Sequence, residues 1–152
     1  MSDWFTIIQR DISKIPSCID HFNGELKNVG LEVSMKGNVE KSSREIPGIV
    51  AHRFNQLQEL ESILEHFNIL MRKERGRLFR KYLEHYERAL TSRDVEKYVD
   101  GEQSVLDLQG IINEVAFLRN KYHGLMKGLE AKQFQINNVI KLRVAGLEDV
   151  TL

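Results

Sequence analysis

The sequence predicts an all-α fold, organised around a long antiparallel helical hairpin. Its 152 residues include only two prolines, Pro16 and Pro47, so more than a hundred residues follow without one that would stop a helix. Apolar residues recur at helical spacing along two long stretches of this proline-free part. The content of 41% hydrophobic and 29% charged residues is typical of a folded, helix-rich protein.

The length and composition fit one main domain with a small appendage. Cys18 is the only cysteine, so no disulfide forms within the chain and a reducing compartment is expected. No apolar run approaches the roughly 18 residues of a membrane span, and the N-terminus lacks the pattern of a signal peptide. We therefore expect a cytoplasmic protein with no membrane partner.

Residues 1–45 read as an N-terminal extension, separate from a helical domain at 46–152. An amphipathic stretch runs from Trp4 to Ile15, and Pro16 is expected to stop it. Apolar and polar residues then alternate over 31–36, which is a weak strand pattern.

The first long helix is expected to begin at Pro47, because proline suits the first helical turn. Its length of up to about 40 residues corresponds to some 60 Å, with Gly76 as a weak point. Apolar residues mark one side of it, at Val50, Phe54, Leu57, Leu60, Leu64, Phe67, Met71, Leu78 and Tyr82.

A connection at 89–103 contains the cap residues Thr91 and Ser92 and leads into the second long helix. The residues 131–138 are expected to break that helix. A short terminal helix would follow, capped by Asn137 or Asn138 and ended by Gly146. Two long helices with narrow apolar sides leave apolar surface uncovered, so we expect other copies of the chain to cover it in a ring-like homo-oligomeric bundle.

The net charge of zero hides a basic segment, since residues 71–88 carry seven basic and three acidic side chains. On a projection of about 100° per residue, six of these cations lie opposite the apolar side of the helix. We call them the basic face: Arg72, Lys73, Arg77, Arg80, Lys81 and Arg88. Arg75 stands apart, on the flank of the apolar side.

The basic face has two interpretations. Cations on a solvent-exposed helix side are common, and acids one turn away normally neutralise them. That neutralisation is missing in the sequence between Arg75 and Lys81, and arginine favours phosphate. We expect polyanion binding through these seven basic residues. Phe79, Tyr82 and Tyr86 lie close by for stacking on unpaired bases, although core packing is the preferred reading for Tyr82.

Patterns that indicate an enzyme or a cofactor are missing from the sequence. The five histidines have no metal-ligand spacing, and "GLMKG" at 124–128 lacks the ending of a phosphate loop. Paired acids such as Glu59 and Glu61 read as helix-surface charges. We expect a non-enzymatic protein without a cofactor.

Three segments resemble the UvsY recombination mediator family of T-even-like phages: "IPGIVAHRF", "RGRLFRKYLEHY" and "KQFQINNVIKLRVAG". The similarity covers about residues 46–147. The family's basic-x-basic-Leu element falls on Arg75 and Arg77, followed by Leu78. This sequence departs from the family at Tyr82–Tyr86, where the end of the helix differs, and in its longer N-terminal part.

The resemblance implies an accessory protein of phage homologous recombination in the host cytoplasm. Such proteins form rings, of six or seven subunits, and bind single-stranded DNA. They load a RecA-like phage recombinase onto strands covered by the phage single-strand-binding protein. Two other functions stay open from the residues alone: a coiled-coil structural or adaptor protein whose basic face is solvated or docks an acidic protein, and a binder of double-stranded DNA or RNA.

Overall fold

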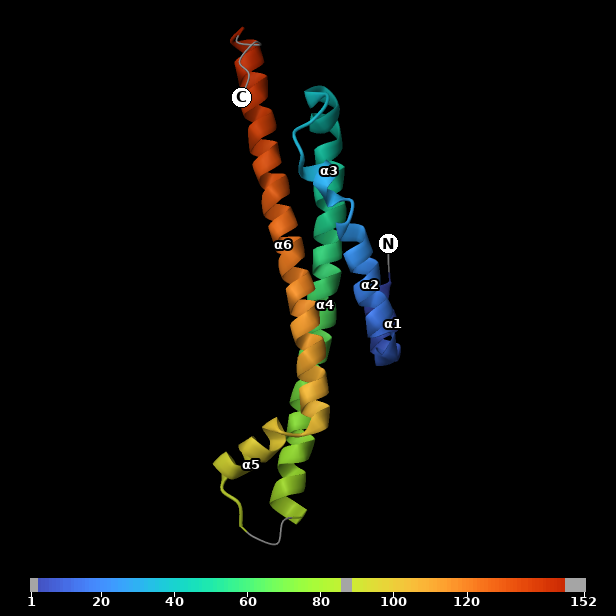
Figure 1. Ribbon diagram of the computed structural model, residues 1–152, viewed down its shortest axis with the longest axis vertical. Helices are drawn as coiled ribbons and strands as arrows, with labels where there is room; N and C mark the ends of the chain where they lie inside the picture. Colours follow the sequence, from blue (N-terminus) through green and yellow to red (C-terminus); the bar gives the residue numbers. More distant parts are fainter. Residues whose placement is uncertain (1–2, 86–88, 147–152) are drawn as a thin grey trace.

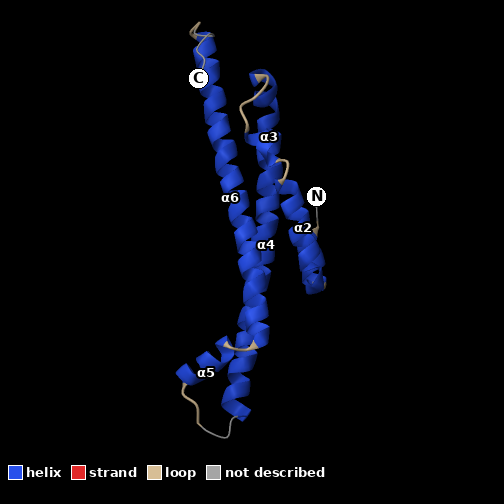
Figure 2. Cartoon of the chain, viewed as in Figure 1, coloured by secondary structure: helices blue, strands red, loops and turns tan. Residues whose placement is uncertain are grey.

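The computed structural model describes residues 3–85 and 89–146, and all regular structure within them is helical. This confirms the all-α prediction. No helix of the described part has an apolar stretch long enough to cross a membrane. In chain order the elements (Figures 1 and 2) are α1 (Trp4–Arg10), the 3-10 turn η1 (Ile12–Lys14), α2 (Ile15–Leu26), α3 (Val29–Val33), α4 (Val39–His85), α5 (Ser92–Asp100) and α6 (Gln103–Val144).

The helices α4 and α6 run antiparallel and form the predicted long hairpin (Figure 1). Their contact is lined by apolar residues three or four positions apart, so that one stripe of each helix is buried. Each such side chain contributes roughly 1.5–3 kcal/mol by leaving water. The stripe includes Leu57, Leu60, Ile63 and Phe67 on α4 and Val115, Leu118, Tyr122, Leu125 and Leu129 on α6.

The helix α4 begins at Val39, eight residues before Pro47, so the predicted start at Pro47 was wrong. Asn38 caps the helix, because its side-chain oxygen accepts hydrogen bonds from the backbone N–H groups of Glu40 (2.8 Å) and Lys41 (3.2 Å). Ion pairs one turn apart, such as Arg44–Glu40 at 2.6 Å, support this polar first part of the helix.

The helix α6 continues to Val144, so the predicted break at 131–138 and the separate terminal helix were wrong. Lys132 and Ile136 are buried and continue the stripe of Leu125 and Leu129. This burial outweighs the low helix propensity of the two asparagines, which is a fraction of a kcal/mol each. The end near Gly146 was predicted correctly, and its φ of 75° is one that glycine adopts without strain.

The N-terminal residues also differ from prediction. Pro16 lies at the start of α2 rather than at the end of a helix, where its missing N–H costs no hydrogen bond. The alternating residues 31–36 do not form a strand: α3 ends at Val33, and the backbone is extended only from Ser34. Short helices therefore fill the segment before α4.

These short helices pack on one side of the hairpin. The apolar side chains of Ile8, Ile15, Cys18 and Phe22 belong to the same core as the α4–α6 contact. The hydroxyl of Tyr122 donates to the Phe22 carbonyl at 3.3 Å. A Cβ on Gly128 would lie only 3.1 Å from Val33, so glycine allows α3 to approach α6 closely. The N-terminal segment covers apolar surface that the hairpin alone would expose.

A buried arginine fixes this segment to α4. Arg53 is only 4% exposed. Its guanidinium donates to both carboxylate oxygens of Glu32 (2.9 and 2.6 Å), to Glu25 (2.8 Å) and to the Gln56 side chain (2.8 Å). Hydrogen bonds from Gln56 and Arg53 lower the pKa of Glu25. We call Arg53, Gln56, Glu25 and Glu32 the Arg53 cluster.

The Arg53 cluster also reaches α6. Lys132, buried on α6, donates from Nζ to the backbone carbonyl of Glu32 at 2.6 Å. Polar side chains from α2, α3, α4 and α6 thus meet in one hydrogen-bonded group. Since no buried side-chain N or O atom in the described part lacks a partner, these polar groups are buried with their hydrogen bonds made.

Replacing Arg53 by alanine is expected to lower the free energy of unfolding by about 3–5 kcal/mol, because it leaves two carboxylates without their cation. Urea unfolding at neutral pH measures this loss. Arg44→Ala is the matched control, since the Arg44–Glu40 pair is exposed on both sides and should be worth less than about 1 kcal/mol. Equal losses in the two variants would contradict the role given to the Arg53 cluster.

Candidate nucleic-acid interface

The basic residues lie at the end of the molecule where α4 ends, α5 crosses and α6 begins (Figure 1). A second, smaller core holds this end together, made of Met71, Leu78, Val95, Val99 and Val105. The Thr91 side chain accepts from the backbone N–H of Asp94 at 3.2 Å and caps α5, as the sequence predicted. The basic part of α4 therefore rests on a packed helix rather than on a free loop.

The aromatic residues of this end are mainly structural. Phe79 and Tyr82 pack against the smaller core, which confirms core packing for Tyr82. The Tyr82 ring stacks on Tyr98 of α5 with centroids 5.5 Å apart, and its hydroxyl donates to the Glu102 carboxylate. Tyr86, the third candidate for base stacking, lies outside the described residues.

Acidic side chains hold three of the predicted DNA-binding arginines. Arg72 pairs with Glu65 at 2.9 Å, and Arg77 binds Glu74 through two hydrogen bonds of 3.0 and 2.6 Å. The premise that neutralisation is missing between Arg75 and Lys81 was therefore wrong. The acid that pairs with Arg77 is three residues away, a spacing at which helical side chains meet.

Arg75 lies beside the contact between α4 and α5, at the edge that the helical projection indicated. Its guanidinium is 2.8 Å from Asp100, at the C-terminal end of α5. The fold brings this carboxylate to Arg75 across 25 positions of sequence, so no local pattern predicts the pair.

Glu74 connects the basic face to α6. Besides binding Arg77, its carboxylate accepts a hydrogen bond from the Ser104 hydroxyl at 2.8 Å. Hydrogen bonds from Arg77 and Ser104 lower the pKa of Glu74 to about 2. Glu74 thus stays ionised and keeps Arg77 engaged throughout the neutral range.

The remaining cations of the basic face that the structure describes are Lys73, Arg80 and Lys81. All three are exposed, and no residue within 3–85 or 89–146 forms an ion pair with them. They line a shallow groove along α4 together with Arg77, Glu84 and His85. Arg88, predicted to belong to the same set, lies outside the described residues.

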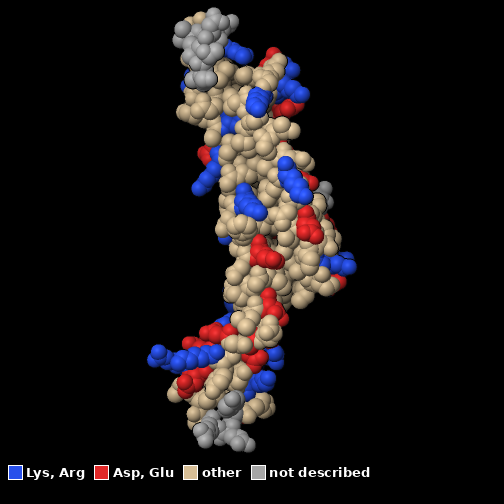
Figure 3. Space-filling view, viewed as in Figure 1, with Lys and Arg blue, Asp and Glu red and all other residues tan. Residues whose placement is uncertain are grey.

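The surface of this end carries both signs of charge (Figure 3). Residues 72–85 of α4 contribute six basic and two acidic side chains, whereas α5 contributes two basic and three acidic ones. The positive charge is therefore concentrated on the side of α4 away from α5. Lys73, Arg80 and Lys81 are its available part.

Tyr98 is a candidate that sequence reasoning missed. It is 46% exposed, and its ring stacks on that of Tyr82. On a projection of about 100° per residue, Tyr98 lies about 60° from Val95, on the flank of the buried side of α5, so the pattern predicts a partly exposed ring but not its position beside the basic residues.

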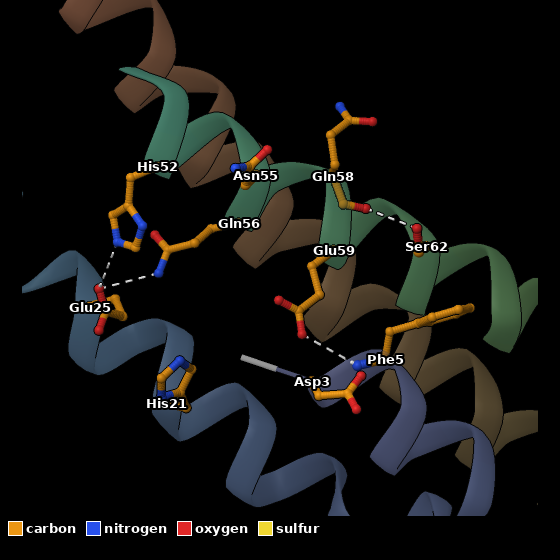
Figure 4. Close-up of a pocket in the computed structure, with 10 residues that line it drawn as sticks. All are labelled: Asp3, Phe5, His21, Glu25, His52, Asn55, Gln56, Gln58, Glu59 and Ser62. Atoms are coloured by element: carbon orange, nitrogen blue, oxygen red, sulfur yellow. Dashed lines mark hydrogen bonds and ion pairs between the residues drawn. The ribbon is translucent and has the colours of Figure 1, made fainter. Parts of the chain in front are cut away.

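A different concavity lies between the N-terminal helices and α4 (Figure 4). Its lining includes the carboxylates of Asp3, Glu25 and Glu59, which would repel phosphate. Glu59 accepts hydrogen bonds from the backbone N–H groups of Trp4 (2.7 Å) and Phe5 (3.3 Å), at the start of α1. These polar groups serve to attach α1 and α2, so the basic end is the better candidate site.

In the described residues, no group of three or more His, Cys, Asp or Glu side chains is placed to hold a metal ion. Burial raises the pKa of the Cys18 thiol to about 12, so at neutral pH it is a packed thiol rather than a reactive thiolate. Comparison of the chain with protein-family models, with curated proteins and with solved structures finds no match.

The lowered pKa of Glu74 predicts a pH-dependent contribution to stability. A carboxylate with a depressed pKa stabilises the fold fully above its unfolded pKa, and this contribution is lost as the pH falls toward the folded value. Glu74→Gln should therefore be less stable than the unmodified chain at pH 6. The difference should shrink between pH 4.5 and about 2.

Urea midpoints measured at several pH values test this, with Glu40→Gln as the control on an exposed ion pair. A difference at Glu74 that is unchanged down to pH 2 would show that the carboxylate does not hold Arg77 and Ser104 together.

Proposed function

We propose that this chain is a non-enzymatic protein that binds single-stranded DNA without sequence preference through the basic end of α4. The observation that supports it best is the set of exposed cations Lys73, Arg80 and Lys81 along α4, none of which forms an ion pair with a residue in 3–85 or 89–146. Like charges held together repel each other, and an anionic strand relieves this repulsion while releasing counterions.

The cations of this face contribute to DNA binding in two ways. Lys73, Arg80 and Lys81 meet phosphates directly. Arg75 and Arg77 bind a strand only by exchanging Asp100 or Glu74 for a phosphate. Because that exchange replaces one charged hydrogen bond by another, it contributes less net affinity than a contact by a free cation.

A base can add to this electrostatic contact by stacking on Tyr98. Tyr98 is 46% exposed and stacks on Tyr82, which lies in the basic part of α4. Stacking of a base on an aromatic ring is worth about 1–3 kcal/mol and tolerates any sequence. This role passes to Tyr98 from Phe79 and Tyr82, whose rings pack in the smaller core.

The resemblance to the UvsY family extends this proposal to a place in recombination. A ring of six or seven copies in the host cytoplasm would offer several basic ends to one strand, and avidity would far exceed the affinity of one end. The proposed partners are a RecA-like phage recombinase and the phage single-strand-binding protein. Holding the strand mainly by its phosphates leaves the bases that do not stack on Tyr98 accessible to the incoming recombinase.

Changing Lys73, Arg80 and Lys81 together to alanine is expected to weaken binding of a labelled oligonucleotide at least tenfold at about 0.1 M salt. Three lost phosphate contacts should also reduce the slope of log K against log salt by about 2, since each contact to single strands contributes about 0.7. Fluorescence anisotropy over a salt series measures both quantities.

The double variant Arg75→Ala with Arg77→Ala is the informative comparison. We expect it to weaken binding less than the triple variant, because both arginines are engaged by acids in the free protein. If the double variant abolishes binding and the triple variant leaves it unchanged, the assignment of the primary contacts is wrong. Light scattering on each variant shows whether the mass of the assembly is preserved.

The alternative function, a helical structural or adaptor protein, is favoured by the ion pairs that already occupy Arg72, Arg75 and Arg77. It requires that the unmodified chain retain no single-stranded DNA at about 0.1 M salt. The third possible function is a binder of double-stranded DNA or RNA. Competition in the same assay tests it, because double-stranded competitors would then displace the labelled strand better than single-stranded ones.

A further inference from the structure

An aromatic side chain stands uncovered in the middle of α6. Phe117 is 64% exposed, and the only described contact of its ring beyond packing is with Lys121, whose Nζ lies 4.6 Å from the ring centroid. Leaving most of a phenyl ring in water forgoes most of the stabilisation that its burial would provide. Glu114, on the preceding turn, and Lys121, on the following turn, flank the ring.

An apolar groove opens on the other side of α6. It lies between α4 and α6, with Phe54 (48% exposed) and Met126 among its apolar lining. Its volume is about 460 Å³, and a cavity of about 150 Å³ already holds a benzene ring. Lys127 and Glu130 stand on its α6 rim.

The ring and the groove face in opposite directions. Met126 follows Phe117 by nine residues, which at about 100° per residue is half a turn around α6. A chain with the ring on one side and the groove on the other can pair head-to-tail with further copies. Such contacts generate rings or helical filaments.

The charges beside the ring and the groove decide the direction of pairing. Along α6, Glu114 precedes the Phe117 ring and Lys121 follows it, so the acid comes first. At the groove the order of charge is reversed, because Lys127 precedes Glu130. If two α6 helices run parallel, Glu114 meets Lys127 and Lys121 meets Glu130. If they run antiparallel, each acid meets an acid and each base a base.

We propose that Phe117 of one copy of this chain inserts into the α4–α6 groove of the next copy, with the two α6 helices parallel. The proposal rests on the homo-oligomer of the proposed function and names the surfaces that would form it. Glu114 and Lys121 are about 10 Å apart along the helix, and Lys127 and Glu130 about 4.5 Å. Long charged side chains span the remaining 3 Å at each end.

The contact uses the side of the hairpin that the N-terminal helices leave open. Gln58 and His123 also line the groove, and the Nε2 atom of His123 lies 3.3 Å from the Glu61 carboxylate. Cyclic symmetry requires every subunit to point the same way along the ring axis, which parallel α6 helices satisfy and antiparallel ones do not.

Phe117→Asp and Phe54→Asp test the two surfaces separately. Each should reduce the mass of the purified full-length chain, measured by sedimentation velocity at about 20 µM, from that of the oligomer to that of the monomer. Ile12→Asp is the matched control, since Ile12 is as exposed as Phe54 (47% against 48%) and lies in η1 outside both surfaces. Circular dichroism and melting confirm that each variant is folded.

Mixing the two variants gives the sharper result. Each retains one intact surface, so an equimolar mixture should form a dimer and grow no further. A mixture that stays monomeric although both variants are folded overturns the proposal, as does unchanged mass in either single variant. A wild-type chain that is monomeric at 20 µM overturns it as well.

The DNA-binding proposal can be tested separately from the proposed interface between copies. The monomeric Phe117→Asp variant should keep weak, salt-dependent oligonucleotide binding and lose the avidity of the assembly, whereas the Lys73, Arg80 and Lys81 triple variant should keep its mass. If the Phe117→Asp variant is monomeric but binds the oligonucleotide with unchanged affinity, the proposed interface is supported and avidity is not the source of tight binding.

Discussion

The Arg53 guanidinium is the constraint on which the arrangement of the chain depends. It is buried on α4, and its donors are satisfied only when Glu32 and Glu25 are brought to it from the segment before α4. A buried cation without partners would cost several kcal/mol, so the fold is unfavourable unless that segment docks in one orientation. The Lys132 bond to the Glu32 carbonyl extends the requirement to α6.

This docking divides the hairpin into a covered and an open side. The N-terminal helices bury Tyr122 and Phe67 on one side, in the core that also holds Ile8 and Phe22. The opposite groove keeps Phe54 accessible. Part of the apolar surface that we expected other copies to cover is therefore covered within the chain by the N-terminal helices, and the groove beside Phe54 remains open.

The helices could be predicted from the sequence where local pattern and burial agree, and not where tertiary contacts outweigh local preference. The spacing from Val50 to Leu78 identified α4 because periodicity alone determines an amphipathic helix. The predicted start of α4 at Pro47 was wrong, because Asn38 and the ion pair of Arg44 with Glu40 stabilise a polar first part of the helix. That part has no apolar periodicity from which it could be predicted.

The same limit applies to the candidate site. Its basic residues could be found by counting charge, since Lys73, Arg80 and Lys81 are exposed as a helical projection requires. The ion pair of Arg75 with Asp100 was not predictable, because it depends on how α5 folds back onto α4. Tyr98 was missed for the same reason: only its stacking on Tyr82 places it beside the basic residues.

The proposed contact and the proposed DNA site are compatible because they occupy different lengths of the same hairpin. Phe117 and the groove lie along the middle of α6, whereas Lys73, Arg80 and Lys81 lie near the end of α4. Parallel subunits would present all basic ends at one rim, where a strand can pass from copy to copy. The shift along α6 from Phe117 to the groove is about 16 Å, so a closed ring requires the hairpins to tilt against its axis.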